Sequence, residues 1–275
     1  MKVTLVQTNS RDDKPVNLEQ TERLLRAAIE EDGPDLVALP ELVTYLGGSV
    51  AGARASAEVL PGGPAYRMLQ QIARDYRVHV HGGSLNEADR DRLYNTTVAF
   101  DPEGREIARY RKIHMFDVVT PDGTVYRESA TYTPGAEIVT YAIGDVRVGC
   151  AICYDLRFGE LFIALARAGA DIIIVPAAFT LMTGKDHWDV LLRARAIETQ
   201  AYILAPGQTG SYVEDGIERM SYGHSLVADP WGTVIARAQD GVGWVSARLD
   251  FDYLQRVRAD LPSNRNRVPG LGAAT

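Results

Sequence analysis

The sequence predicts an α/β fold in which helices are layered over two packed sheets. Short runs rich in Val and Ile alternate with longer amphipathic segments along the chain, a pattern typical of this fold class. About nine such runs occur, and that number suits two packed sheets better than one open sheet. No linker, repeat or low-complexity tract interrupts them. We therefore expect one domain over residues 1–262, followed by an extended or partly disordered arm over residues 263–275, which lack periodicity.

The short apolar runs are predicted to be strands because they are rich in β-branched residues and are bounded by Gly and Pro. In chain order they cover residues 3–8, 35–40, 78–83, 95–100, 146–153, 171–177, 201–207, 224–230 and 243–249. Their composition is typical of strands that are buried or half-buried in a sheet.

The amphipathic segments between these runs are predicted to be helices. They cover residues 17–29, 64–76, 158–168 and 187–200. Asn17 is expected to be the N-cap of the first helix, and Pro64 suits the first turn of the second. Gly169 is expected to end the third helix.

Composition and charge exclude several classes of protein. The chain has 275 residues, 46% of them hydrophobic, which is enough to bury a core without disulfides or metals. Its formal net charge of −7 makes binding to nucleic acid phosphates unfavourable. No apolar run reaches the roughly eighteen residues that span a membrane. The N-terminus lacks the pattern of a secretory signal and only two cysteines occur, so we expect a cytoplasmic protein.

Three reactive side chains follow predicted strands. Glu41 comes directly after the run 35–40, Lys112 lies beyond the run 95–100, and Cys153 ends the run 146–153. Active sites of α/β proteins are assembled at strand ends. A carboxylate, an ammonium and a thiol can form a nucleophilic site: the carboxylate takes the thiol proton, the sulfur attacks a carbonyl carbon, and the ammonium stabilises the oxyanion.

Each of these residues also has an ordinary structural interpretation. A Glu after a strand is usually a solvated charge or a helix cap, and a Lys in a basic stretch is usually solvated or ion-paired. A buried Cys in an apolar strand is usually an inert packing residue. Spacing alone does not decide between these interpretations and catalysis.

The two cysteines, Cys150 and Cys153, form a C-x-x-C motif, which also occurs in redox and zinc sites. Cys150 lies inside a predicted strand, where positions three apart point to opposite faces, so the thiols are not expected to meet. The redox protein stays an alternative. The five histidines are dispersed, and neither a phosphate-binding glycine motif nor a serine elbow occurs. We therefore expect neither a metal nor a cofactor.

Several blocks of the sequence together resemble the nitrilase, or carbon–nitrogen hydrolase, superfamily, which uses a Glu–Lys–Cys triad. The resemblance covers residues 1–268, and the CYDLRF and HWDVLLRARAIETQ blocks are its most specific parts. The matching segments are LVALPE at 36–41, YNTTVAFDPEGREIARYRKIHMFD at 94–117, VGCAICYDLRFGE at 148–160, AAFTLMTGKDHWDVLLRARAIETQAYILAPGQTG at 177–210, YGHSLVADPWGTVIA at 222–236 and LDFDYLQRVRADLP at 249–262.

The resemblance implies a four-layer αββα sandwich whose subunits pair through helices into a homodimer or a higher homo-oligomer. It implies that Glu41 is the general base, Lys112 the oxyanion stabiliser and Cys153 the nucleophile. Glu128 matches an additional glutamate that orients the lysine or assists proton transfer, and the backbone N–H of Tyr154 is the implied second oxyanion donor.

Two further residues are candidates for substrate contact. Phe179 and Thr180 follow the predicted strand 171–177, where a pocket wall is expected. The segment after Glu41, LVTYLGGSVAGARA, departs from the family pattern, and a loop at this place also helps to form the pocket.

The chain most resembles the Nit branch of the superfamily, which contains deaminated glutathione amidase and ω-amidase. This implies hydrolysis of the C–N bond of a small carboxylate-bearing amide through a cysteine thioester, with no partner other than the small-molecule amide. A nitrilase or a hydrolase of N-carbamoyl compounds uses the same triad and stays an alternative. A catalytically silent binding protein is the alternative of a different class.

Overall fold

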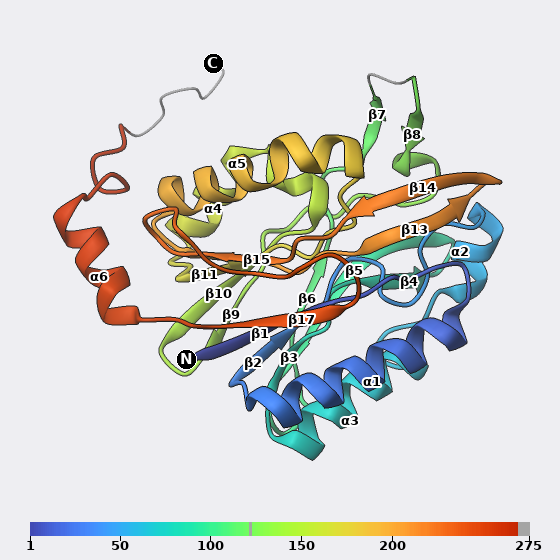
Figure 1. The fold of residues 1–275 in the computed structure, drawn as a ribbon, viewed down its shortest axis with the longest axis horizontal. Coiled ribbons are helices and arrows are strands. Elements are labelled where there is room, and N and C mark those ends of the chain that lie inside the picture. Colours follow the sequence, from blue (N-terminus) through green and yellow to red (C-terminus); the bar gives the residue numbers. More distant parts are fainter. Residues whose placement is uncertain (121–122, 269–275) are drawn as a thin grey trace.

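The computed structural model describes residues 1–120 and 123–268, which form two main sheets, two hairpins and flanking helices (Figure 1). The strands of the first sheet are β1 (Lys2–Gln7), β2 (Leu36–Ala38), β3 (His79–His81), β4 (Leu85–Asp89), β5 (Arg92–Phe100), β6 (Glu106–Arg111) and β17 (Gly243–Arg248). Those of the second sheet are β9 (Thr140–Ile143), β10 (Val146–Cys150), β11 (Ile172–Ile174), β12 (Tyr202–Ala205), β15 (Leu226–Ala228) and β16 (Val234–Arg237). The hairpins are β7 (Asp117–Val119) with β8 (Val125–Arg127), and β13 (Thr209–Glu214) with β14 (Ile217–Tyr222).

The helices lie mainly on the outer faces of the two sheets. They are α1 (Lys14–Asp32), α2 (Val50–Ser56), α3 (Pro64–Tyr76), α4 (Gly159–Arg167), α5 (Leu181–Thr199) and α6 (Phe251–Asp260), with the 3₁₀ turns η1 (Glu128–Ala130) and η2 (Cys153–Arg157). Figure 1 shows α1 and α3 against one sheet and α4 and α5 against the other. This arrangement confirms the predicted αββα sandwich.

Each sheet has a parallel centre flanked by antiparallel strands. In the first sheet β1, β2 and β3 are parallel neighbours, and in the second β10, β11 and β12 are. β2 and β10 lie in different sheets, and the packing of the two sheets around one core allows the loops that follow these strands to contribute to a common site.

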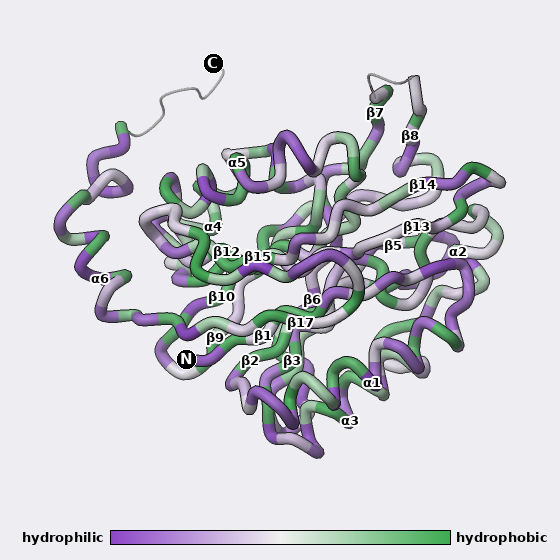
Figure 2. The backbone as a smooth tube through the Cα atoms, viewed as in Figure 1, coloured by the Kyte–Doolittle hydropathy of each residue, from purple (hydrophilic) through white to green (hydrophobic). Residues whose placement is uncertain are grey.

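Alternating side chains along the central strands fill two apolar regions. Leu36 and Ala38 of β2 pack in the core that β10, β11 and β12 share, whereas Val37 packs with α1 and α3. Period-two alternation therefore allows a short strand to bury both of its faces. Figure 2 shows the matching hydropathy pattern, with hydrophobic residues concentrated on the inner strands and interrupted by hydrophilic ones along α1.

All nine predicted strands and all four predicted helices are present, but the predicted N-cap was wrong. Asp13 caps α1 by accepting a hydrogen bond from the Val16 N–H, because the helix begins earlier, with Pro15 in its first turn. Asn17 is instead buried inside the helix, where its side-chain amide donates to the carbonyl oxygens of Arg11 and Thr44.

The last described residues form a turn rather than an extended segment at 263–266. The side chains of Asn264 and Arg267 donate hydrogen bonds to backbone oxygens at the C-terminal end of α5, those of Thr199 and Glu198. The rest of the predicted arm, residues 269–275, lies outside the described residues. Across residues 1–120 and 123–268, every helix is too short or too polar to cross a membrane.

Candidate active site

The seven residues singled out from the sequence line one cavity of about 350 Å³. Glu41 follows β2, Lys112 follows β6, and Cys153 opens η2 shortly after β10. The remaining four are Glu128, Tyr154, Phe179 and Thr180. Side chains far apart in sequence are thus brought together at the ends of strands from both sheets.

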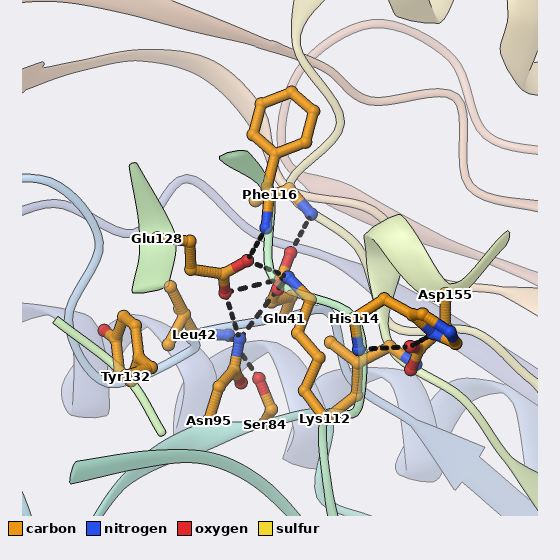
Figure 3. Close-up of polar contacts among 12 residues, drawn as sticks. Glu41, Leu42, Ser84, Asn95, Lys112, His114, Phe116, Glu128, Tyr132 and Asp155 are labelled. Atoms are coloured by element: carbon orange, nitrogen blue, oxygen red, sulfur yellow. Dashed lines mark hydrogen bonds and ion pairs between the residues drawn. The ribbon is translucent and has the colours of Figure 1, made fainter. Parts of the chain in front are cut away.

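Glu41 is held from three sides and is only 3% exposed. Its Oε1 atom accepts a hydrogen bond from Lys112 Nζ at 2.9 Å and another from Asn95 Nδ2 at 2.8 Å (Figure 3). Its Oε2 atom accepts from the Ala178 N–H at 2.8 Å. These contacts fix the carboxylate in one orientation within a buried, polar site.

Lys112 is a fully buried ammonium between two carboxylates. Its Nζ atom lies 2.8 Å from both carboxylate oxygens of Glu128, in addition to the contact with Glu41. Burial alone would lower the pKa of Lys112, but Glu128 and Glu41 outweigh it and hold that pKa well above its ordinary value. Lys112 is therefore a fixed positive charge at neutral pH.

Glu128 begins the turn η1, and its carboxylate lies beside the Lys112 ammonium and the Asn95 amide (Figure 3). It accepts a third hydrogen bond, from the Phe116 N–H, at 2.6 Å. Burial raises the pKa of Glu128, Lys112 opposes that shift, and Glu41 adds to it. Two carboxylates thus compete for one ammonium, and excess negative charge accumulates beside the cavity.

Cys153 opens η2 with a backbone φ of +45°, in the left-handed region. This conformation costs a non-glycine residue about 1–3 kcal/mol and is concentrated at functional sites. Its N–H donates to the Pro176 carbonyl at 2.8 Å, which ties the turn to the segment after β11. Burial and the Glu41 carboxylate raise the pKa of the Cys153 thiol well above its ordinary value, although Lys112 opposes the shift. The resting sulfur is therefore protonated.

Tyr154 follows Cys153 and carries a backbone donor without a partner. Within residues 1–120 and 123–268, no carbonyl accepts a hydrogen bond from its N–H. Its ring packs edge-on against Phe116, with ring centroids 5.0 Å apart, and against Phe158 at 5.3 Å.

Asp155, buried in the same turn, joins η2 to the segment that carries Lys112. Its Oδ1 atom accepts from the His114 N–H at 3.1 Å and lies 2.7 Å from His114 Nδ1 (Figure 3). Its Oδ2 atom accepts from the Tyr110 hydroxyl at 2.6 Å and from the Ile152 N–H at 2.8 Å. These four contacts fix the Cys153 turn relative to Lys112, two residues before His114.

The cavity wall combines the loop after Glu41 with segments of the second half of the chain. Leu42, residues 45–50 and Ala53 form one side, so the segment that departs from the family pattern is part of the pocket. Phe179 packs 5.1 Å from Trp188 between ring centroids, and Thr180 is the N-cap of α5. Both follow β11, as expected from the sequence.

Sequence reasoning missed two donors to Glu41, the Asn95 amide and the Ala178 N–H. The signal for Asn95 was a polar residue inside an apolar strand, which is rarely buried without a specific partner. The Ala178 N–H could not be predicted, because every residue except proline carries a backbone N–H.

Cys150 does not take part in the site. Burial raises its pKa to about 12, it packs in the core between the sheets, and both cysteines are free thiols. Unlike Cys153, Cys150 does not line the cavity, and burial alone shifts the pKa of its thiol, so no neighbouring carboxylate is there to take its proton. Among the described residues, no group of three or more His, Cys, Asp or Glu side chains could hold a metal ion.

Comparison with known proteins shows the family of the chain. The family profile described as carbon–nitrogen hydrolase matches residues 2–259. The chain belongs to the carbon–nitrogen hydrolase family. Its resemblance to this family therefore extends from β1 into α6 and includes every residue of the candidate site.

Relatives that match over nearly their whole length include two named amidases and a solved structure. A deaminated glutathione amidase of Synechocystis sp. is 39% identical over 268 residues, which are 96% of each chain. An omega-amidase of Xenopus tropicalis is 36% identical and covers 97% of this chain and 94% of its own. The crystal structure of Saccharomyces cerevisiae Nit3, from branch 10 of the nitrilase superfamily, is 32% identical with a TM-score of 0.85, covering 95% and 94% of the two chains.

Proposed function

We propose that the protein is a cysteine-dependent amidase that hydrolyses the C–N bond of a small carboxylate-bearing amide through a thioester on Cys153. The observation that carries the proposal is that Cys153, Glu41 and Lys112 line one cavity, with Lys112 Nζ 2.9 Å from Glu41. A thiol, a base and a fixed cation beside it are what nucleophilic attack on an amide needs.

The first proposed step transfers the thiol proton to Glu41 as the sulfur attacks. The raised pKa of Cys153 means that little thiolate exists before substrate binds. Glu41 is the adjacent base, and its orientation is fixed by Ala178, Asn95 and Lys112. A new S–C bond forms, and the carbonyl π electrons move onto oxygen.

The oxyanion is proposed to be stabilised by Lys112 and by the Tyr154 N–H. Lys112 is a permanent positive charge in a buried site, where electrostatic stabilisation is stronger than in water. The unpaired Tyr154 N–H supplies a neutral donor next to the sulfur. Glu128 holds the Lys112 ammonium from the other side.

Glu41 then returns the proton to the nitrogen, the C–N bond breaks, and ammonia or an amine leaves. The acyl group remains on Cys153 as a thioester. A water molecule that gives a proton to Glu41 attacks the thioester carbonyl, and the C–S bond breaks. The thiolate takes that proton back, so the acid product leaves and the free enzyme is restored.

The names of the relatives support deaminated glutathione or a 2-oxoglutaramate-type amide as substrate, because one relative is a deaminated glutathione amidase and another an omega-amidase. The cavity of about 350 Å³ is at the small end of ligand sites, which favours a compact substrate.

The test is ammonia release from four compounds: deaminated glutathione, 2-oxoglutaramate, an aliphatic nitrile and an N-carbamoyl amino acid. The proposal expects turnover of at least one of the two amides and much slower turnover of the others. Preferential turnover of the nitrile or the carbamoyl compound would assign the alternative reaction to the same triad. No turnover of any compound, with a Cys153 that resists alkylation, would identify a silent binding protein.

The two cysteines provide a matched pair of variants for this assay. Cys153→Ala is expected to abolish turnover because it removes the nucleophile, whereas Cys150→Ala is expected to keep most of it. An equal loss of turnover in both variants would favour the interpretation of Cys150 and Cys153 as a C-x-x-C redox motif.

We also propose a homodimer located in the cytoplasm. Val190 and Ile197, seven residues apart on α5, are 65% and 48% exposed, and the neighbouring Trp231 is 55% exposed. Such an apolar stripe on a helix is typical of an interface. A dimer mass in light scattering that is lost in Val190→Asp supports the pairing, and a monomeric parent protein contradicts it.

A further inference from the structure

A buried arginine lines the cavity away from the residues assigned to the reaction. Arg219 lies on β14, opposite Tyr212 of β13, and its side chain is only 9% exposed. Both residues line the same cavity as Cys153. An arginine is rarely buried to this extent without partners for its five N–H donors.

Arg219 contacts Glu214 and Tyr126, but few of its donors make an aligned hydrogen bond. The Nε and Nη1 atoms are buried, and neither donates a hydrogen bond within the described chain. Nη2 has one long contact, 3.5 Å to the Val125 carbonyl. The guanidinium lies 4.2 Å from the centre of the Tyr126 ring, and Nε is 2.5 Å from Glu214 Oε2, an ion pair without hydrogen-bond alignment. The site therefore has donors to offer an additional acceptor.

The other cations on the cavity are less suited to hold a ligand. Lys112 is already bound by two carboxylates. Arg127 is exposed, so water competes with any partner and weakens the pairing. Among the described lining residues, Arg219 combines burial, positive charge and spare donors. A planar guanidinium is the group best suited to bind a carboxylate with two parallel hydrogen bonds.

The hairpin that carries Arg219 is held in place by the loop after Glu41. The Gly48 N–H donates to the Val213 carbonyl at 2.6 Å, and the Asp215 N–H donates to the Gly48 carbonyl at 2.8 Å. Gly47 has a φ of +84°, and a Cβ atom there would lie 2.3 Å from the Val213 oxygen. The glycine pair therefore permits a close backbone contact that positions the hairpin over the cavity.

We propose that Arg219 is the specificity-determining residue that binds the carboxylate of the substrate while its amide carbonyl lies at Cys153. This inference rests on the proposed amidase function and assigns the recognised group to a residue. It favours monoamides of dicarboxylic acids over neutral amides of the same length. Glu214, which contacts Arg219 and also lines the cavity, competes with the incoming carboxylate for the guanidinium.

The test measures binding in the Cys153→Ala background, where turnover cannot interfere. The probes are glutaramate, which carries a carboxylate, and pentanamide, a neutral amide of the same chain length. Adding Arg219→Met is expected to raise the dissociation constant of glutaramate by about 10- to 100-fold, as for loss of a charge-assisted bidentate contact. The dissociation constant of pentanamide is expected to change less than about threefold, because the rest of the pocket is intact.

A matched control distinguishes this role from a structural one. Arg237→Met removes an arginine that pairs with Asp189 and does not line the cavity, and it is expected to leave both constants unchanged. Glu214→Gln removes the competing carboxylate and is expected to tighten glutaramate binding severalfold. A variant of Arg219 that weakens both probes equally, or neither, overturns the proposal.

Measurements of turnover test the role of Arg219 separately from the proposed amidase function. With Cys153 present, Arg219→Met is expected to raise KM for glutaramate by about 10- to 100-fold while kcat changes less than about threefold. A protein that binds glutaramate through Arg219 but releases no ammonia from either amide contradicts the amidase function alone. A protein that hydrolyses both amides equally well contradicts the role of Arg219 alone.

Discussion

Replacing Lys112 by methionine tests the charge arrangement of the site most severely. In the native protein one ammonium lies 2.9 Å from Glu41 and 2.8 Å from Glu128, and all three side chains are largely buried. Lys112→Met keeps an unbranched side chain, one atom shorter, and removes the charge. Two carboxylates then face each other without a cation, and breaking a buried pair in this way costs about 3–5 kcal/mol of stability.

The loss of stability in Lys112→Met is expected to grow as the pH rises. Burial already raises the pKa of Glu128, and losing Lys112, which opposes that shift, raises it further. The folded variant then holds a proton that the unfolded chain releases above its ordinary pKa of 4.5. The contribution of Glu128 to the stability of the variant is therefore greatest at low pH and falls by about 1.4 kcal/mol per pH unit as the pH rises from 4.5 toward the raised pKa.

The assay is urea unfolding at pH 5, 6, 7 and 8, with ammonia release measured in parallel. Loss of an oxyanion donor lowers kcat by about 100- to 1000-fold. Lys112→Met/Glu128→Gln removes the surplus carboxylate and is expected to regain about 2 kcal/mol without regaining activity. Lys2→Met, at a partly exposed pair with Asp32, is expected to cost at most about 1 kcal/mol. The reasoning is refuted if the unfolding free energies of Lys112→Met and the parent stay parallel and within 1 kcal/mol.

Two further predictions concern buried groups, His81 in β3 and Asp155 in the turn η2. Burial lowers the pKa of His81 to about 3 from an ordinary 6.5. The contribution of neutral His81 to stability is therefore complete above pH 6.5 and is lost as the pH falls toward 3. Between pH 7 and pH 5 the expected loss of unfolding free energy is about 2 kcal/mol. His81→Gln should show a smaller loss over that interval in urea unfolding, and an unchanged loss contradicts the assignment. Asp155→Asn leaves some of four donors without an acceptor, so we expect about 2–5 kcal/mol of destabilisation and a lower kcat. Full kcat in a destabilised variant would mean that Asp155 does not position Cys153.

The central strands and the reactive positions could be predicted because both follow from short-range patterns. Runs such as the one containing Leu36, Val37 and Ala38 are apolar at every position, as strands buried on both faces must be. Glu41 directly follows such a run and Cys153 ends another, so predicting the strands also located the side chains at their ends. Pro64 marked the start of α3 because its ring fixes the backbone angle of a first helical turn.

The hairpin of β13 and β14 and the helix α2 could not be predicted in the same way. The hairpin of β13 and β14 alternates polar and apolar residues weakly, and the burial of Arg219 arises only from its packing against Tyr126 and Glu214. α2 is seven residues long and rich in small residues, so its periodicity is weak. The N-cap was misplaced because Asp13 and Asn17 both suit a cap, and the tertiary partners of Asn17 decide between them.

The most direct test of the account is to trap the acyl group on the proposed nucleophile. The protein is mixed with saturating glutaramate, quenched in acid during turnover, and digested for peptide mass spectrometry. An added mass of one glutaryl group is expected on Cys153, none on Cys150, and none on either cysteine when the quench precedes the substrate. Turnover by the parent protein without an adduct at Cys153, or an adduct at Cys150, would contradict the assignment of Cys153 as the nucleophile.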